Sequence, residues 1–118
     1  MKNIAPQIYR QRLLIEGFYS IKVDKKVITD FFIEVSKELR LRMYGKPIIF
    51  SPAGMGKKEN QGYDAFVPLI DSGISLYVWS GHNFFSIIIY TCKGFDNKKA
   101  VKFVKSYFKA KSVVFEEF

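Results

Sequence analysis

The sequence predicts an α+β fold, a two-layer sandwich in which a mainly antiparallel sheet carries two helices on one face. Two segments repeat their apolar residues every three or four positions, as the buried face of a helix does. The other apolar runs are short and rich in aliphatic and aromatic residues, as strands are. Hairpin-like links between the middle runs favour antiparallel pairing. A length of 118 residues suits one domain, so residues 1–118 are expected to form a single domain.

The first half of the chain predicts a strand, a helix and a short strand. Residues 12–21 (RLLIEGFYSI) have the aliphatic and aromatic content of a strand. Asp24 is the expected N-cap of the helix, which Gly45-Lys46-Pro47 would break, and residues 48–50 form the short strand. The expected buried face of the helix consists of Val27, Ile28, Phe31, Phe32, Val35 and Leu39.

The second half predicts three strands, a helix and a last strand. Residues 51–62 are rich in glycine and are expected to form a mobile loop that could act as a lid. The strands cover residues 63–70, 74–79 and 84–91, and the turn at 80–83 has good hairpin chemistry. Asp96 or Asn97 can cap the second helix, and residues 112–118 form the last strand. The expected buried stripe of this helix consists of Ala100, Val101, Val104 and Phe108.

Composition and charge narrow the class of protein. The net charge of +8 favours an anionic partner such as nucleic acid. The lysines, however, are spread over helix faces and loops, so the favoured interpretation is a lysine-rich surface exposed to solvent. A single cysteine, Cys92, and a single histidine, His82, exclude a disulfide framework and a Cys/His zinc cluster, and no metal is expected. Without a signal-peptide core or a membrane-length apolar run, the sequence predicts a soluble cytoplasmic protein.

The sheet face away from the helices is expected to need a partner. Two helices can cover only one face, and the other is rich in aromatic and aliphatic side chains. The sequence therefore predicts a homodimer, or a dimer with a related chain, formed by packing a second sheet on this face.

A motif with a recognisable order runs from Asp71 to Cys92 and reads DSGISLYVWSGHNFFSIIIYTC. It holds a serine after an acidic residue, a strand with Ser75 and Trp79, a turn, and a strand that ends in Thr-Cys. The spacing resembles, without a gap, the processing-site segment of the prokaryotic S-adenosylmethionine decarboxylase family. Residues 12–19 (RLLIEGFY), 50–52 (FSP) and 113–118 (VVFEEF) are similar to other segments of that family, so the resemblance covers nearly the whole chain.

The resemblance implies a pyruvoyl-dependent decarboxylase of polyamine (spermidine) biosynthesis. In this family a serine hydroxyl, here that of Ser72, attacks the preceding carbonyl, here that of Asp71, and the chain is cut. The serine is left as a pyruvoyl group, an electron sink that does the work of pyridoxal. Cys92 would return a proton to the α-carbon of the substrate. Phe50 would stack on adenine, and Trp79 matches the family's tryptophan and is assigned to substrate binding.

Several departures from the family pattern leave the activity open. Tyr77 stands where the family has a histidine that assists processing, and Asp64 stands in place of an assisting serine. Gly73 replaces the histidine after the serine, and Asp71 replaces a glutamate. Tyr77 and Asp64 can both donate or accept a proton, so they are candidates for the missing helpers. Loss of a positioned acid or base costs roughly two to four decades in rate.

The sequence therefore leaves four alternative functions. The chain self-processes at Asp71-Ser72 and decarboxylates S-adenosylmethionine, or it decarboxylates arginine or ornithine by the same chemistry. A third alternative is an uncleaved, inactive homologue that binds a ligand or regulates an active related chain in a mixed dimer. The fourth is a basic nucleic-acid-binding module on the same sheet, for which binding should fall steeply with salt.

Overall fold

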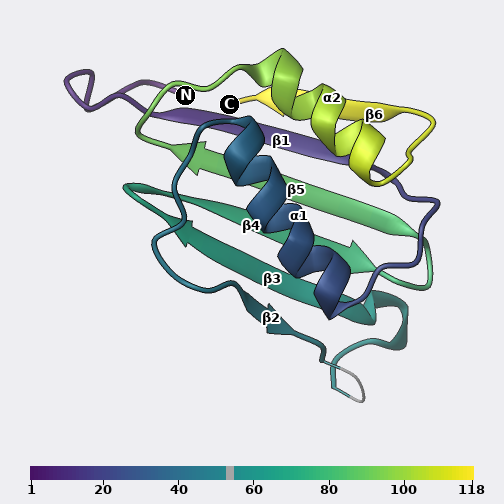
Figure 1. Ribbon diagram of the computed structural model, residues 1–118. Helices are drawn as coiled ribbons and strands as arrows, with labels where there is room; N and C mark the ends of the chain where they lie inside the picture. Colours follow the sequence, from purple (N-terminus) through teal and green to yellow (C-terminus); the bar gives the residue numbers. More distant parts are fainter. Residues whose placement is uncertain (53–54) are drawn as a thin grey trace.

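The computed structural model describes residues 1–52 and 55–118 and shows one sheet with both helices on the same face (Figure 1). The sheet has six strands in the order β2-β3-β4-β5-β1-β6, and all neighbours are antiparallel. The predicted α+β two-layer sandwich is confirmed. The elements are β1 (Gln11–Phe18), α1 (Lys25–Glu38), β2 (Ile48–Phe50), a 3-10 turn η1 (Lys58–Asn60), β3 (Gly62–Leu69), β4 (Ser72–Trp79), β5 (Phe84–Thr91), α2 (Asn97–Tyr107) and β6 (Val113–Glu117).

Both helices begin at the aspartates that the sequence indicates. The Asp24 carboxylate accepts a hydrogen bond from the backbone N–H of Val27 at 2.9 Å, and that of Asp96 accepts one from Lys99 at 3.1 Å. Each bond satisfies one of the backbone donors that a helix start leaves free. Of the two caps considered for α2, Asp96 is the one used, and Asn97 is the first helical residue.

Both helices end in the same way. For α1, the predicted end of the helix was wrong. The helix stops at Glu38 rather than at Gly45-Lys46-Pro47. Arg40 has a positive φ of 56°, which turns the chain so that the N–H of Leu41 reaches the Ser36 carbonyl at 2.8 Å. Lys109 does the same after α2 with a φ of 47°. This is the Schellman arrangement, in which glycine is the usual residue.

The core fills the space between the helices and the sheet. Alternate residues of β1, β4 and β5 point toward the helices, so Leu13, Ile15, Ile74, Leu76, Ile87 and Ile89 are fully buried. Phe31 of α1 contacts Phe108 with ring centroids 5.0 Å apart, and Phe108 stacks on Phe85 at 4.7 Å. These aromatic contacts tie both helices to the centre of the sheet.

The opposite face of the sheet is open to solvent, as the sequence predicts. None of the helices among the described residues covers it (Figure 1). Its large exposed side chains are Phe18, Ile48, Phe50, Phe66, Tyr77, Tyr90 and Val114. Exposed apolar surface of this extent is typical of an interaction face, and the predicted dimer stays a prediction.

Two other expectations are changed in detail. The first strand ends at Phe18, earlier than residue 21, and β4 begins at Ser72, two residues before the predicted start at residue 74. In the loop expected at residues 51–62, the structure describes the 3-10 turn η1, while residues 53 and 54 lie outside the described residues, so the lid prediction is not tested.

Candidate functional site

Ser72 and Cys92 lie together at one end of the sheet. Ser72 begins β4 and is paired in register with Thr91, the last residue of β5, so that Cys92 follows directly. The backbone N–H of Cys92 donates a hydrogen bond to Ser72 Oγ at 3.2 Å. The predicted nucleophile and the predicted proton donor are therefore neighbours, as the spacing of the motif requires.

The peptide bond before Ser72 lies in a strained turn. The β3–β4 hairpin closes through Ile70 and Asp71, because Leu69 pairs with Ser72. Asp71 has a positive φ of 56°. For an L-residue the left-handed conformation costs about 1–2 kcal/mol, although aspartate is one of the residues that tolerate it best. The bond whose cleavage the family resemblance implies is thus held in an unfavourable backbone conformation.

Tyr77, Asp64 and Phe50 form a row across the sheet at a distance from Ser72. Phe50 pairs with Asp64, and Asp64 pairs with Tyr77, in the register of β2, β3 and β4. Tyr77 is five residues after Ser72 on the same strand, which is roughly 16 Å along the chain. An odd separation also puts the two side chains on opposite faces of the strand. The structure therefore does not bring Tyr77, Asp64 or Phe50 to the Ser72 of the same chain.

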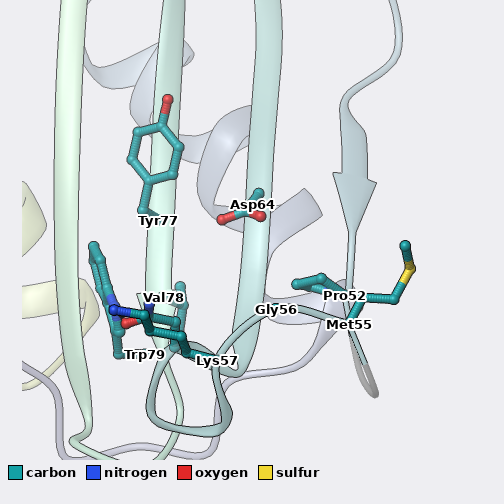
Figure 2. Close-up of a pocket in the computed structure, with 9 residues that line it drawn as sticks. Pro52, Met55, Gly56, Lys57, Asp64, Tyr77, Val78 and Trp79 are labelled. Atoms are coloured by element: carbon teal, nitrogen blue, oxygen red, sulfur yellow. Dashed lines mark hydrogen bonds between the residues drawn. The ribbon is translucent and has the colours of Figure 1, made fainter.

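A hollow of about 410 Å³ lies next to this row. Figure 2 shows Tyr77 and Asp64 on neighbouring strands, with the loop that carries Gly56 and Lys57 at the end of the hollow. Trp79 also lines it, and the indole N–H donates to Asn60 Oδ1 at 3.1 Å. Trp79 is a predicted substrate contact, whereas Asn60 and Lys57 were not predicted as site residues, because polar residues are ordinary in a loop.

A second hollow of about 390 Å³ lies beside Ser72 on the open face. Its lining residues are Phe66, Asp71, Ser72, Gly73, Ser75, Ile88 and Tyr90. Asp71 supplies the only carboxylate among them. Phe66 and Tyr90 were not predicted as site residues, because a lone aromatic in a strand is by default a packing residue.

Other kinds of site find no support in the described part of the chain. Residues 1–52 and 55–118 contain no cluster of three or more His, Cys, Asp or Glu side chains that could hold a metal ion. None of the helices in these ranges is long and apolar enough to cross a membrane.

The architecture and the family comparison agree. The fold is that of the adenosylmethionine decarboxylases: the crystal structure of adenosylmethionine decarboxylase from Aquifex aeolicus VF5 matches with a TM-score of 0.69 and 17% identity, over 94% of this chain and 89% of that chain. A family model for S-adenosylmethionine decarboxylase matches residues 15–118. The chain therefore belongs to the S-adenosylmethionine decarboxylase family. No curated protein matches the sequence.

Proposed function

We propose that this chain acts in polyamine biosynthesis as a pyruvoyl-type S-adenosylmethionine decarboxylase whose reactive group forms from Ser72. The observation that carries the proposal is the contact between Ser72 Oγ and the N–H of Cys92 at 3.2 Å. It joins the two residues that the family motif assigns to self-processing and to proton return. The cytoplasmic location predicted from the sequence is part of the same proposal.

The chain's own residues can form the group in balanced steps. Ser72 Oγ attacks the carbonyl carbon of Asp71 and gives up its proton, which the Ser72 nitrogen receives as the peptide becomes an ester. β-Elimination then gives the α-proton of residue 72 to solvent and breaks the Cβ–Oγ bond, so that Asp71 leaves with a free carboxylate that keeps Oγ and residue 72 becomes dehydroalanine. Water replaces its nitrogen as ammonia and gives the pyruvoyl group.

The surroundings of residue 72 fit such a group. The hollow beside it leaves room for a substrate, and the N–H of Cys92, which donates to Ser72 Oγ, is freed when that oxygen leaves with the Asp71 carboxylate. A pyruvoyl group there would supply an electrophilic ketone that withdraws electrons from the carbon losing carbon dioxide. Cys92 is exposed, so its thiol is accessible to return a proton to that carbon.

Asp64 and Tyr77 are proposed to act on the Ser72 of a second copy. They lie on the open face, Tyr77 on β4 five residues after its own Ser72 and Asp64 opposite it on β3. Two copies packed through this face and reversed end for end would bring the Asp64–Tyr77 pair of each to the open-face hollow that Asp71 and Ser72 of the other line. Such packing would also bury the exposed aromatic side chains of both sheets.

Carbon dioxide release from carboxyl-labelled S-adenosylmethionine tests the proposed activity. The wild-type chain should release label and the Ser72→Ala variant should not, whereas Ser106→Ala, an exposed serine on α2, should match the wild type. Labelled arginine and ornithine, run beside it, decide between the substrates. Equal rates for wild type and Ser72→Ala would contradict the proposal.

A mixing experiment tests the contribution of the second copy. Ser72→Ala cannot be cut, and an Asp64→Asn/Tyr77→Phe double variant is expected to be cut slowly. In a mixture, only the double variant should be cut faster, because its Ser72 can meet the intact Asp64–Tyr77 pair of the other chain. If mixing leaves the cutting rate unchanged, the helpers do not come from a second copy.

A second candidate function is that of an uncleaved partner subunit of an active decarboxylase. It is favoured by one observation: in the described ranges, no side chain is hydrogen-bonded to Ser72 Oγ. Without a positioned base, cleavage is slower by roughly 10²–10⁴. A chain that stays whole alone, but changes the rate of a related decarboxylase in a mixed dimer, would establish this alternative.

A further inference from the structure

The positive charge of the chain is concentrated in one segment. Residues 98–111, which form most of α2 and the turn after it, hold six of the 19 lysines and arginines and none of the 11 aspartates and glutamates. This segment therefore carries +6 of the net charge of +8, and the rest of the chain is close to neutral. The excess of lysines over acidic residues is thus a property of one helix and its C-terminal turn.

Five of these lysines share one surface. Lys98, Lys102 and Lys105 are spaced four and three residues apart, which places them on one side of α2. A hollow of about 410 Å³ at the end of the helix is lined by Lys102, Lys105, Ser106, Lys109, Ala110 and Lys111. All five lysines are exposed. The name lysine face is used below for Lys98, Lys102, Lys105, Lys109 and Lys111.

The lysine face has no carboxylates to balance it, whereas the other helix does. α1 lies on the same side of the sheet (Figure 1) and carries three lysines and three acidic residues, of which Lys26 and Asp30 form an ion pair at 2.7 Å. In residues 1–52 and 55–118, no lysine of the lysine face takes part in an ion pair. Lysines three or four residues apart on a helix repel one another and destabilise it. An anionic partner would remove this repulsion.

The chemistry of the surface distinguishes among anionic partners. A helix that binds a membrane inserts its apolar face, but the apolar face of α2, with Ala100, Val104 and Phe108, is fully buried in the core. Single-stranded nucleic acid is held by aromatic side chains on which its bases stack, and the lysine face has none. The phosphates of a duplex need only positive charge and follow one another every 3.4 Å along each strand. The rise from Lys98 to Lys105, about 10 Å, spans about three of them.

We infer that the lysine face binds the phosphate backbone of a double-stranded nucleic acid without reading its sequence. Lysine binds phosphate as a point charge and offers no fixed geometry for recognition of base edges. α2 and the open face lie on opposite sides of the sheet (Figure 1), so the lysine face and the hollow beside Ser72 can be occupied at the same time. The inference is independent of the proposed decarboxylase activity.

Fluorescence anisotropy of short labelled duplexes, one of DNA and one of RNA, tests the inference with the full chain. Contacts to about four phosphates give a slope of about −3.6 for the logarithm of the binding constant against that of the salt concentration. Affinity for duplex DNA should therefore fall about 150-fold between roughly 50 and 200 mM salt. A sequence-scrambled duplex should bind equally well.

Two triple variants with the same net charge locate the binding surface. Lys102→Gln/Lys105→Gln/Lys111→Gln removes lysines that line the hollow, and it should weaken binding about 10-fold or more at low salt and bring the slope to about −1. Lys25→Gln/Lys26→Gln/Lys37→Gln removes the same charge from α1 and should stay within about 3-fold of the wild type. All six lysines are exposed, and glutamine has nearly the helix propensity of lysine, so both variants should fold.

Several results would overturn the inference. Equal loss of affinity in the two triple variants would mean that only the net charge matters, and no binding of either duplex at low salt would contradict it outright. Tighter binding to vesicles of phosphatidylserine and phosphatidylcholine than to the duplexes would make this a lipid surface. Polyglutamate that competes as well as unlabelled duplex would make it a surface for acidic proteins. A preference for RNA or for DNA agrees with the inference and identifies the kind of duplex.

Discussion

Replacing Gly62 with alanine should destabilise the sheet beside the Asp64–Tyr77 hollow. A Cβ at this position would lie 1.8 Å from the backbone oxygen of Val78 and 2.7 Å from its carbonyl carbon. Both atoms belong to the backbone of β4, so no side chain can rotate away to make room. The start of β3 must therefore separate from the end of β4.

The size of the effect follows from these contacts. Overpacking of this kind costs about 1–3 kcal/mol. The separation also strains the bond from the N–H of Ser80 to the Gln61 carbonyl, now 2.9 Å, and losing it adds about 1 kcal/mol. A loss of about 3 kcal/mol in the free energy of unfolding lowers the Tm of a domain of this size by about 12 °C.

Thermal unfolding followed by circular dichroism checks this value against two other glycines. A Cβ at Gly73 comes closer than 3 Å only to the far edge of the exposed Phe66 ring, which can swing outward, and lies at an ordinary 3.6 Å from the Val67 oxygen. Gly73→Ala should therefore lower the Tm by a few degrees at most. A Cβ at Gly81 has nothing within 4 Å, so Gly81→Ala should be neutral. If Gly62→Ala melts within 2 °C of Gly81→Ala, the close approach of β3 to Val78 is wrong.

Three further predictions concern the helices. Arg40→Gly and Lys109→Gly should each raise the free energy of unfolding by about 0.5–1 kcal/mol, because both residues occupy a left-handed conformation that glycine adopts without strain, and urea titration measures the gain. Asp24→Ala removes the cap on the Val27 N–H and should lower the Tm by about 4 °C in a melting experiment, whereas Asp24→Asn should retain most of the stability. The hydroxyl of Tyr107 donates a hydrogen bond to the Val27 carbonyl at 2.7 Å. Burial raises the pKa of this hydroxyl to about 12. The folded state favours the neutral phenol, so the contribution of Tyr107 to stability is present below pH 10 and is lost as the pH rises toward 12. Urea unfolding at pH 9 and pH 11 should show this loss of stability in the wild type. The loss should be smaller in Tyr107→Phe.

The elements of the fold could be predicted because local signals and packing agree. The helical repeats give the buried faces of α1 and α2, and Asp24 and Asp96 give their starts. The helix ends could not be predicted, since Arg40 and Lys109 take the position where glycine is the usual signal. Leu41 is buried just after the turn, and this tertiary contact supports a conformation that the local sequence does not favour.

The candidate site could be predicted only in part. The meeting of Ser72 and Cys92 follows from the spacing of two strands joined by a short turn. The resemblance made Tyr77 and Asp64 candidate helpers of Ser72, and their separation from it follows only from the register of the sheet. Phe66 could not be found from the sequence as a lining residue of the hollow beside Ser72, because the position of its ring depends on a bare glycine in the neighbouring strand.

The chemical identity of residue 72 is the most direct test of the central claim. Mass spectrometry of the purified chain after long incubation should find two fragments, one ending at Asp71 and one starting at residue 72, and only the second should gain mass with a carbonyl reagent such as hydroxylamine. The Ser72→Ala chain should stay whole and unlabelled. A wild-type chain that keeps its full mass of 13.7 kDa and takes up no reagent would contradict the claim that Ser72 becomes the reactive group.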